Sequence, residues 1–297
     1  RAGNSLEAFH RQALAFGHAL NNDFRKLRVG IIGCGGTGSA TAMLLARLGI
    51  GQLLLIDNDI VDRTNLNRLH GATQADADAM TPKVDVVSRE IARMALGVRV
   101  TRINAWVGDT QCRDALKSCD VIFAATDDHD GRLFLNRFAY YYLAPVIDMG
   151  LAIEIDHGQP PALRSLDGRV TVLMPGNTCL LCRDVINPAV ALAESLKRMN
   201  PEEHERRKAE GYVAGGGNPS PAVVTFTTEL ACMAVNELIH RLQGFRGEGE
   251  VSSNRVRKFR LGEDRLPGHR PRQFCPVCAT ANLWGRGDAE PFLGRVG

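Results

Sequence analysis

The sequence predicts an α/β fold: a Rossmann-like, mostly parallel sheet flanked by helices, with an antiparallel extension and a structural zinc site. Three observations predict this fold. A strand, a glycine-rich turn, a helix and a second strand follow one another over residues 29–59, later apolar runs alternate with helical patterns, and two Cys-x-x-Cys pairs lie further along the chain. At 297 residues the chain can bury a large core, and one elaborated domain fits better than two independent ones.

The first unit is typical of nucleotide-binding proteins. The apolar strand 29–32 enters a glycine turn, and a helix over 40–48, closed by Gly49, leads to a strand over 52–56. Glycines let the backbone approach phosphates, the helix N-terminus offers free N–H groups, and a carboxylate at the end of the second strand binds a ribose hydroxyl. We therefore expect nucleotide contacts from the turn and from the end of that strand, at Gly33, Gly35, Gly36, Gly38, Ser39, Asp57 and Asp59.

The residues beyond this unit bear on which nucleotide binds. A glycine turn followed by an acidic residue also describes NAD-binding domains, so the unit alone does not decide. Asn65, Arg68 and Lys83 add an amide and two cations just beyond the ribose-binding strand. The pyrophosphate of NAD already faces the helix and has little use for added cations, whereas a triphosphate does. The sequence therefore favours ATP.

The remaining elements continue the α/β alternation. An N-terminal helix is expected over residues 5–27, and further helices over 83–95, with Thr81 as N-cap, 109–117, 130–142 and 223–242. Strands are expected over 98–103, 120–125, 145–148 and 255–261, with an antiparallel hairpin of 151–155 and 169–173. A polar irregular stretch over 183–221 contains a helix starting at Asn200, and the tail over 281–297 is expected to be mobile.

Asp127 follows the buried strand 120–125, at the edge of the sheet where parallel α/β folds bind ligands. An N-cap for the helix that follows is the alternative role for this carboxylate, and the two roles are compatible.

The eight cysteines fall into two groups. Two Cys-x-x-Cys pairs, without a secretory signal, favour a tetrahedral structural zinc over disulfides. Two unrelated reduced pairs, or a redox pair, are the alternative. The predicted zinc ligands are Cys179, Cys182, Cys275 and Cys278, whereas Cys34, Cys112, Cys119 and Cys232 stand singly.

The composition disfavours some classes of partner. The net charge is only +3 and charged residues make up 23% of the chain, so nothing in the electrostatics points to nucleic acid or to an anionic membrane. No apolar run is long enough to span a bilayer and no signal peptide is visible, so we expect a cytoplasmic protein. The chain begins at Arg1 without a methionine, which leaves room for a preceding domain.

Taken together, these motifs resemble those of the ThiF/MoeB/HesA superfamily, the adenylating enzymes related to ubiquitin-activating enzymes. The resemblance covers roughly residues 8–280. It rests on the successive motifs Gly33-x-Gly35-Gly36-x-Gly38-Ser39, Asp57-x-Asp59-x-Val61, Asn65-Leu66-x-Arg68, Pro82-Lys83 and Thr126-Asp127. Asp128 departs from the pattern, since the family often has asparagine at that position.

The resemblance implies an enzyme and roles for several residues. Asp127 would bind Mg²⁺, and Arg11, in an N-terminal segment over residues 1–27, would reach the ATP of the partner subunit in a homodimer. A solvated arginine is the alternative for Arg11. Residues 28–280 would form the adenylation domain, with 183–221 as a crossover loop over the tail of the substrate. The catalytic set would be Arg11, Arg68, Lys83 and Asp127, with ATP and Mg²⁺ as cofactors beside the structural Zn²⁺.

The implied substrate is a ubiquitin-like or sulfur-carrier protein ending in glycine, activated for conjugation or for sulfur transfer, and a conjugating enzyme could follow. Family members often carry a thioester-forming cysteine in the crossover loop, yet no cysteine lies between Cys182 and Cys232. Cys232 sits in an apolar helix, where cysteine usually acts as a small hydrophobe. Ser220 or Ser195 could form an oxyester only with an adjacent base, which the sequence does not display.

Three alternatives stay open. The substrate of the same chemistry could be a peptide or a tRNA base. An NAD-dependent dehydrogenase would explain the glycine turn and Asp57 but would leave Arg68, Lys83 and Asp127 unused. A noncatalytic scaffold for a ubiquitin-like fold should have lost an ATP-site residue, and none is lost.

Overall fold

The computed structural model describes residues 7–156, 158–160, 162–209, 221–247, 252–279, 281, 284–287, 289 and 292. Within them one sheet of eight strands runs in the order β3-β2-β1-β4-β5-β6-β7-β8. The strands are β1 Arg28–Ile32, β2 Gln52–Ile56, β3 Arg99–Ile103, β4 Val121–Ala124, β5 Val146–Asp156, β6 Ala162–Leu173, β7 Asn254–Lys258 and β8 Glu263–Arg265. The helices are α2 His10–Lys26, α3 Gly36–Leu48, the 3₁₀ turn η1 Arg63–Asn65, α4 Gln74–Asp78, α5 Lys83–Arg93, α6 Thr110–Lys117, α7 His129–Tyr141, α8 Pro188–Met199, α9 Pro201–Ala209 and α10 Val224–Gln243.

The first five strands form a parallel sheet, because β1 pairs in parallel with both β2 and β4, β2 with β3, and β4 with β5. The chain order reverses at β1, with β2 on one side and β4 on the other. Ligands of open α/β sheets bind beyond the carboxyl ends of the strands at such a point. The fold therefore places the β1–α3 turn and the ends of β2 and β4 at the expected binding edge.

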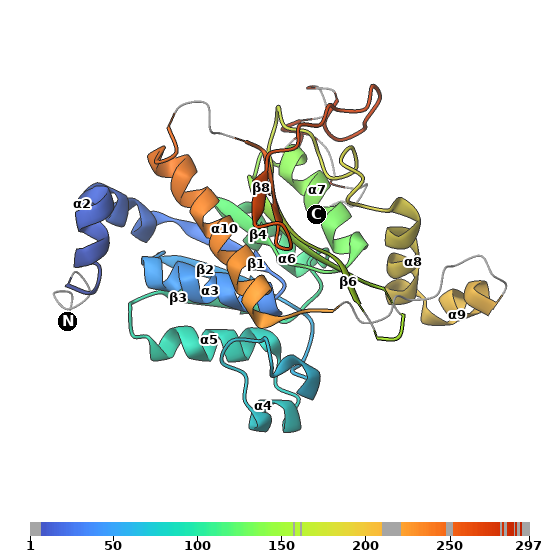
Figure 1. The fold of residues 1–297 in the computed structure, drawn as a ribbon, viewed down its shortest axis with the longest axis horizontal. Coiled ribbons are helices and arrows are strands. Elements are labelled where there is room, and N and C mark those ends of the chain that lie inside the picture. The colour runs from blue at the N-terminus through green and yellow to red at the C-terminus, as the bar shows by residue number, and fades with distance from the viewer. Residues whose placement is uncertain are drawn as a thin grey trace.

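Helices cover both faces of the parallel sheet (Figure 1). On one face α2, α3, α5 and α10 pack around Val29, Ile31, Leu53 and Leu55. On the other face α6 and α7, together with the cysteine pairs, pack around Ile32, Leu54 and Ile122. The apolar residues of β1 and β2 thus alternate between two buried faces, which explains why these strands are nearly uninterrupted hydrophobic runs.

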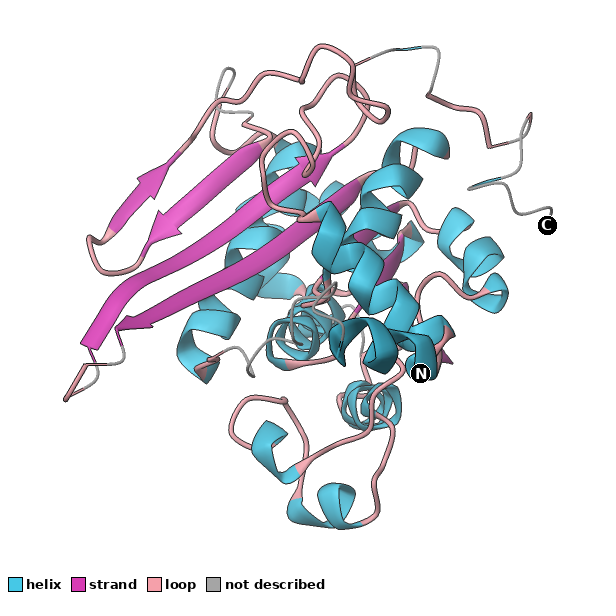
Figure 2. Ribbon diagram, turned by 90° about the vertical axis from the view of Figure 1, so that its right-hand side faces the viewer, coloured by secondary structure: helices cyan, strands magenta, loops and turns pink. Residues whose placement is uncertain are grey.

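The antiparallel extension is longer than the sequence predicted. The separate strand predicted over 145–148 and the hairpin strand over 151–155 form one strand, β5, which pairs in parallel with β4 and in antiparallel register with β6. β7 and β8 continue the extension. Figure 2 shows the two long strands, β5 and β6, projecting beyond the helical layers. The sequence predicted two strands here, yet β5 passes through Gly150 without a break.

The prediction of an irregular stretch before Asn200 was wrong, because α8 occupies Pro188–Met199. Asn187 caps this helix by accepting hydrogen bonds from the N–H groups of Ala189 and Val190 at 3.0 and 3.3 Å. Proline at the first helical position after an asparagine cap is the same signature that correctly located α9. The N-cap predicted at Thr81 was also wrong, since α5 starts from Pro82 without a side-chain cap.

The two ends of the described chain both pack against the body. α2 is broken at Gly17, whose φ of 81° is non-helical, and buries Leu20 and Phe24. In the segment predicted to be a mobile tail, Phe292 is buried and its ring lies 5.3 Å from that of Phe134 on α7. None of the described helices is long and apolar enough to cross a membrane.

Candidate active site

The glycine turn between β1 and α3 uses its glycines in different ways. Gly33 has a φ of 87°, a conformation that glycine adopts at no steric cost. A Cβ on Gly38 would lie 1.7 Å from the carbonyl oxygen of Gly33, so close packing requires glycine there. A Cβ on Gly35 would meet nothing within 4 Å, although Gly35 lines the cavity described below. Gly33 and Gly38 thus shape the turn, whereas Gly35 leaves room beside it.

The N-terminus of α3 lies at the same cavity, which Gly36 and Thr37 also line. Gly35 is its N-cap residue, and no side chain caps the helix. Helix N-termini attract anions through their N–H groups and the helix dipole. Ser39 is fully buried, and its hydroxyl accepts a hydrogen bond from the N–H of His70 at 3.1 Å. Gly33, Gly35 and Gly36 line the cavity described below, whereas Gly38 and Ser39 do not.

Asp57 follows β2 and is held rigidly. Its Oδ2 accepts a hydrogen bond from the N–H of Cys34 at 2.5 Å and its Oδ1 accepts one from the N–H of Asp59 at 2.7 Å. Burial raises the pKa of Asp57, and Lys83 together with the two N–H donors offsets part of that rise. The carboxylate is fixed at the cavity wall with lone pairs left to accept a further hydroxyl.

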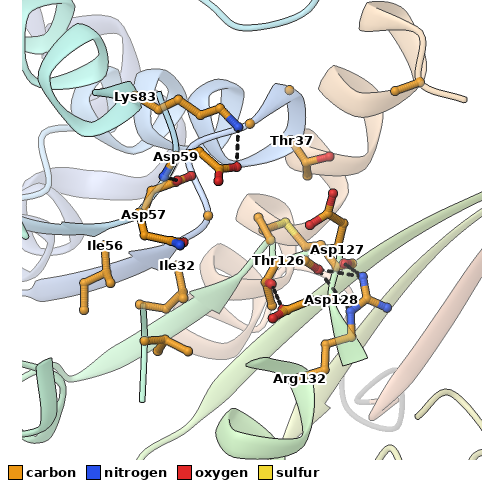
Figure 3. A pocket seen from close by; sticks show the side chains of 18 of the residues that line it. Ile32, Thr37, Ile56, Asp57, Asp59, Lys83, Thr126, Asp127, Asp128 and Arg132 are labelled. Atoms are coloured by element: carbon orange, nitrogen blue, oxygen red, sulfur yellow. Dashed lines mark hydrogen bonds and ion pairs between the residues drawn. The ribbon is translucent and has the colours of Figure 1, made fainter. Parts of the chain in front are cut away.

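Lys83 stands at the start of α5 and forms an ion pair with Asp59, with Nζ 2.7 Å from Oδ2 (Figure 3). The backbone N–H of Lys83 also donates to the carbonyl oxygen of Asp59 at 3.0 Å. Burial acts to lower the pKa of Lys83, but Asp57, Asp59 and Asp127 outweigh it and raise the pKa above its ordinary value. The ammonium group is therefore charged at neutral pH and lies among three carboxylates.

Asn65 and Arg68 come from η1 and the turn after it, and both line the cavity. Asn65 Oδ1 accepts from the N–H of Asp62 at 3.1 Å, which completes a capping box for η1. Arg68 Nη1 donates to the carbonyl oxygen of Thr64 at 2.5 Å. The same Nη1 also donates to Asn67 Oδ1 at 3.2 Å. Since both bonds start from Nη1, the N–H groups of Nη2 and Nε stay available for a phosphate as far as the described residues show.

Asp127 lies across the cavity from these cations, beyond the end of β4. Figure 3 shows its carboxylate on the side that faces Thr37 at the start of α3. It is exposed, and within the described part of the chain it has no hydrogen-bond or ion-pair partner. The alternative of an N-cap is wrong, because Asp128 is the N-cap residue of α7 and even its side chain does not cap the helix.

One cavity of about 590 Å³ joins these groups. This volume falls within the range of small-molecule sites. The residues fit Mg²⁺, since a free carboxylate at the cavity wall is the kind of ligand that Mg²⁺ takes together with the phosphates of a nucleotide. Sequence reasoning missed the far wall, which is formed by Trp106, Arg132, Glu194, Lys197 and Arg198. Three of these come from α8, so failing to predict that helix also hid its residues.

The four paired cysteines form a cluster away from the cavity. Their sulfur atoms lie within 4.8 Å of one another, with 3.6 Å between Cys179 and Cys275 and 3.7 Å between Cys182 and Cys278. A tetrahedral zinc with Zn–S bonds of about 2.3 Å sets sulfur atoms about 3.8 Å apart. The cluster therefore fits the predicted structural zinc, which would join the loop after β6 to the segment after β8.

The candidate nucleophiles are poorly placed. Burial raises the pKa of Cys232, as does the nearby carboxylate of Glu229, and Cys232 does not line the cavity. Burial also raises the pKa of the other single cysteines, Cys34, Cys112 and Cys119. Ser195 is contacted by Arg198, a hydrogen-bond donor and not a base, and Ser220 lies outside the described residues. Arg11 is exposed on α2 and is not part of the cavity wall.

At the edge of the parallel sheet, one cavity is lined by a glycine turn, a helix N-terminus without a side-chain cap, the fixed carboxylate of Asp57 and two cations. This arrangement is typical of nucleotide-binding α/β proteins. The chain belongs to the ThiF family, whose model matches residues 9–279. The family expected from the sequence motifs and the fold class are thereby confirmed.

Named relatives are consistent with this membership. The chain is 28% identical over 155 residues to the SAMP-activating enzyme E1 of Haloferax volcanii, covering 52% of this chain and 52% of that enzyme. It is 27% identical over 234 residues to the molybdopterin-synthase adenylyltransferase of Escherichia coli K12, covering 75% of this chain and 88% of that enzyme. The chain thus spans about half the length of the archaeal relative.

The fold also matches a solved structure, that of E. coli MccB with ATP. The TM-score is 0.67, and the match covers 91% of this chain and 74% of MccB. The sequences are 18% identical, so this likeness concerns the fold alone.

Proposed function

We propose that this protein uses ATP to adenylate the C-terminal carboxylate of a small ubiquitin-like or sulfur-carrier protein. The observation that carries the proposal is one cavity in which the glycine turn, Asp57, Arg68 and Lys83 face Asp127, a carboxylate with no hydrogen-bond or ion-pair partner among the described residues. Names of the relatives support it, because they are adenylyltransferases and modifier-activating enzymes.

The chemistry follows from the poor electrophilicity of a carboxylate. A carboxylate oxygen of the substrate attacks the α-phosphorus of ATP, the bond from that phosphorus to the α,β-bridging oxygen breaks, and pyrophosphate leaves. The product is an acyl-adenylate, in which AMP is a good leaving group for a later nucleophile. Both reactants are anions, so catalysis depends on positioning and on neutralising charge.

Each group of the cavity has a part in this reaction. Asp57 accepts a hydrogen bond from a ribose hydroxyl, and the N–H groups at the start of α3 face the phosphates. Arg68 and Lys83 neutralise phosphate charge, with Asn65 as a further polar contact. Asp127 would hold Mg²⁺, which supplies additional charge neutralisation at the phosphates.

Arg11 enters the proposal through a homodimer. It is exposed on α2 and absent from the cavity wall of its own chain, so an ATP that it contacts would belong to a partner subunit. Mixing inactive Arg11→Ala and Asp127→Ala proteins tests this directly. Dimers that combine one subunit of each variant would keep one complete site, so activity should reappear on mixing; the absence of any recovery would remove Arg11 from the site.

The experiment that tests the function is ATP–pyrophosphate exchange. A panel of ubiquitin-like and sulfur-carrier proteins ending in glycine is supplied with Mg·ATP, and each is also supplied with its C-terminus amidated. Exchange should require one member of the panel and should be lost with its amidated form and with Asp127→Ala enzyme. Exchange that is indifferent to amidation would contradict activation of the terminal carboxylate. Because no described single cysteine is poised as a nucleophile, the Cys232→Ala enzyme should retain exchange.

A further inference from the structure

The helix α8 is attached to the loop around Asp127 by polar contacts. Arg198 Nη1 donates to Asp130 Oδ2 at 2.5 Å, and the backbone N–H of Asp130 donates to Glu194 Oε2 at 2.9 Å. The N–H of Asn187, the cap of α8, donates to Nδ1 of His129 at 3.1 Å. Two segments some 60 residues apart in the chain are therefore joined just beside the proposed metal-binding carboxylate.

Arg198 also makes a second kind of contact. Its guanidinium carbon lies 3.3 Å from the centroid of the Trp106 ring, so the planar group is stacked on the indole. The indole in turn donates from Nε1 to Asp128 Oδ2 at 3.4 Å. Arg198 thereby bears on the loop at two points, directly at Asp130 and through Trp106 at Asp128.

The loop is also held on its other side. Arg132 donates to the carbonyl oxygen of Thr126 from Nε at 3.1 Å and from Nη2 at 2.9 Å. The Thr126 hydroxyl donates to Asp128 Oδ1, as Figure 3 shows. The residues on both sides of Asp127 are therefore fixed, whereas no described residue donates a hydrogen bond to the Asp127 carboxylate, which leaves its lone pairs for a ligand.

Apolar packing does little to hold α8 in place. Among its described residues only Ala191 is fully buried; Leu196 is half-buried, and the large apolar side chains Leu192 and Met199 are 68% and 70% exposed. The Arg198–Asp130 pair is better shielded, with side chains 28% and 14% exposed. Polar contacts in a partly desolvated setting depend strongly on geometry, so they fix an orientation more precisely than a sparse apolar contact does.

We propose that Arg198 is a positioning residue that, through Asp130 and Trp106, holds the 126–130 loop so that Asp127 is preorganised to bind Mg²⁺. This inference rests on the proposed function, because it concerns the metal of Mg·ATP. It gives α8 a role at the site that neither the family motifs nor the phosphate-facing cations Arg68 and Lys83 supply.

Charge and positioning predict opposite changes in Mg²⁺ affinity when Arg198 is removed. Arg198 is a cation close to the place where Mg²⁺ would bind, so by charge alone its removal should strengthen Mg²⁺ binding. Positioning predicts the opposite sign. Direct contact of Arg198 with the nucleotide predicts a third pattern, in which affinity for the nucleotide falls even without a metal.

The test measures thermal unfolding while Mg²⁺ is titrated at saturating α,β-methylene-ATP, and separately measures binding of the same nucleotide in EDTA. For Arg198→Ala we expect the half-saturating Mg²⁺ concentration to rise about tenfold, equivalent to 1.4 kcal/mol. Nucleotide affinity in EDTA should stay at the wild-type value. Arg198→Lys keeps the charge but not the planar stack, and should fall in between.

A metal-free readout and a matched control complete the design. In the absence of ligand, amide hydrogen exchange of residues 126–130 should be faster in Arg198→Ala than in wild type. Arg207→Ala removes an arginine that is 49% exposed on α9 and paired with Glu203. It should change neither the Mg²⁺ requirement nor the hydrogen exchange of residues 126–130. An unchanged or lower Mg²⁺ requirement in both Arg198 variants would overturn the positioning role. A wild-type protein without any Mg²⁺-dependent response would overturn the proposed function as well.

Discussion

Gly35→Ala should weaken nucleotide binding about a hundredfold without harming the fold. The backbone of Gly35 is extended, with φ −72° and ψ −155°, which alanine also adopts. Its Cβ would meet no atom within 4 Å and would project into space beside the uncapped N-terminus of α3. We therefore expect the free energy of unfolding of the ligand-free protein to change by less than about 1 kcal/mol.

The effect on ATP binding follows from the same geometry. A methyl group in this space would push a phosphate away from the helix N-terminus and break about two hydrogen bonds to a charged group, each worth roughly 1.5–3 kcal/mol. A loss of about 3 kcal/mol raises the dissociation constant more than a hundredfold. Mg·ATP at a hundred times the wild-type dissociation constant adds about 2.7 kcal/mol of stability, and this would shrink to about 0.4 kcal/mol in the variant.

The assay is thermal unfolding with and without Mg·ATP. The wild-type midpoint should rise by several degrees, and the Gly35→Ala midpoint by less than about two. Gly268→Ala is the matched control, because its Cβ would also meet nothing within 4 Å and Gly268 is not part of the cavity wall. A Gly35→Ala protein that is stabilised by Mg·ATP as strongly as the wild type would refute the assignment of the phosphate site.

Three further predictions concern other parts of the molecule. Lys83→Met removes the cation between Asp57 and Asp59 and should weaken ATP binding at least tenfold in calorimetry, which unchanged affinity would contradict. Asp76→Asn should lower the free energy of unfolding by about 2 kcal/mol at pH 7, because Arg89 donates to both carboxylate oxygens and holds the pKa of Asp76 well below its usual range. Since the pKa of Asp76 is depressed in the folded state, its contribution to the free energy of unfolding is fully present above the unfolded pKa near 4. It is lost as the pH falls through the folded-state pKa, so the stabilities of wild type and Asp76→Asn, measured by denaturation, should converge only in strong acid. Cys275→Ser should reduce bound zinc measured by mass spectrometry and lower the midpoint, whereas Cys232→Ser should retain the metal; equal zinc in both would exclude the four-cysteine site.

The nucleotide half of the fold was predictable because its signals are local. The β1–α3–β2 unit is encoded by apolar runs, a glycine turn and the C-cap Gly49 with φ 85°, each of which acts over a few residues. The structure then separates what the motif could not. Close packing against Gly33 requires glycine at position 38, whereas Gly35 leaves open space beside the turn. The buried Ser39 accepts a hydrogen bond from the N–H of His70, although all three residues belong to one run of sequence.

The far wall of the site could not be predicted from local patterns. Trp106, Arg132 and Arg198 come from three separate segments, and only the folded sheet brings them together. The cap signature Asn187-Pro188 and the apolar spacing of Leu192, Leu196 and Met199 could have located α8. That spacing would still have misplaced the helix, because Leu192 and Met199 are mostly exposed and only Ala191 is buried. The contact of Arg198 with Asp130 depends on where α8 packs in the folded protein, and a single sequence carries little information about that placement.

The central claim is that this cavity binds Mg·ATP through Asp127, and thermal unfolding of wild-type and Asp127→Ala proteins with Mg·ATP or NAD tests it most directly. No knowledge of the protein substrate is needed. We predict that Mg·ATP and not NAD stabilises the wild type, by about 2.7 kcal/mol at a hundred times its dissociation constant, and that Asp127→Ala loses most of this stabilisation while unfolding normally without ligand. Stabilisation by NAD alone, or by neither ligand, would contradict the account.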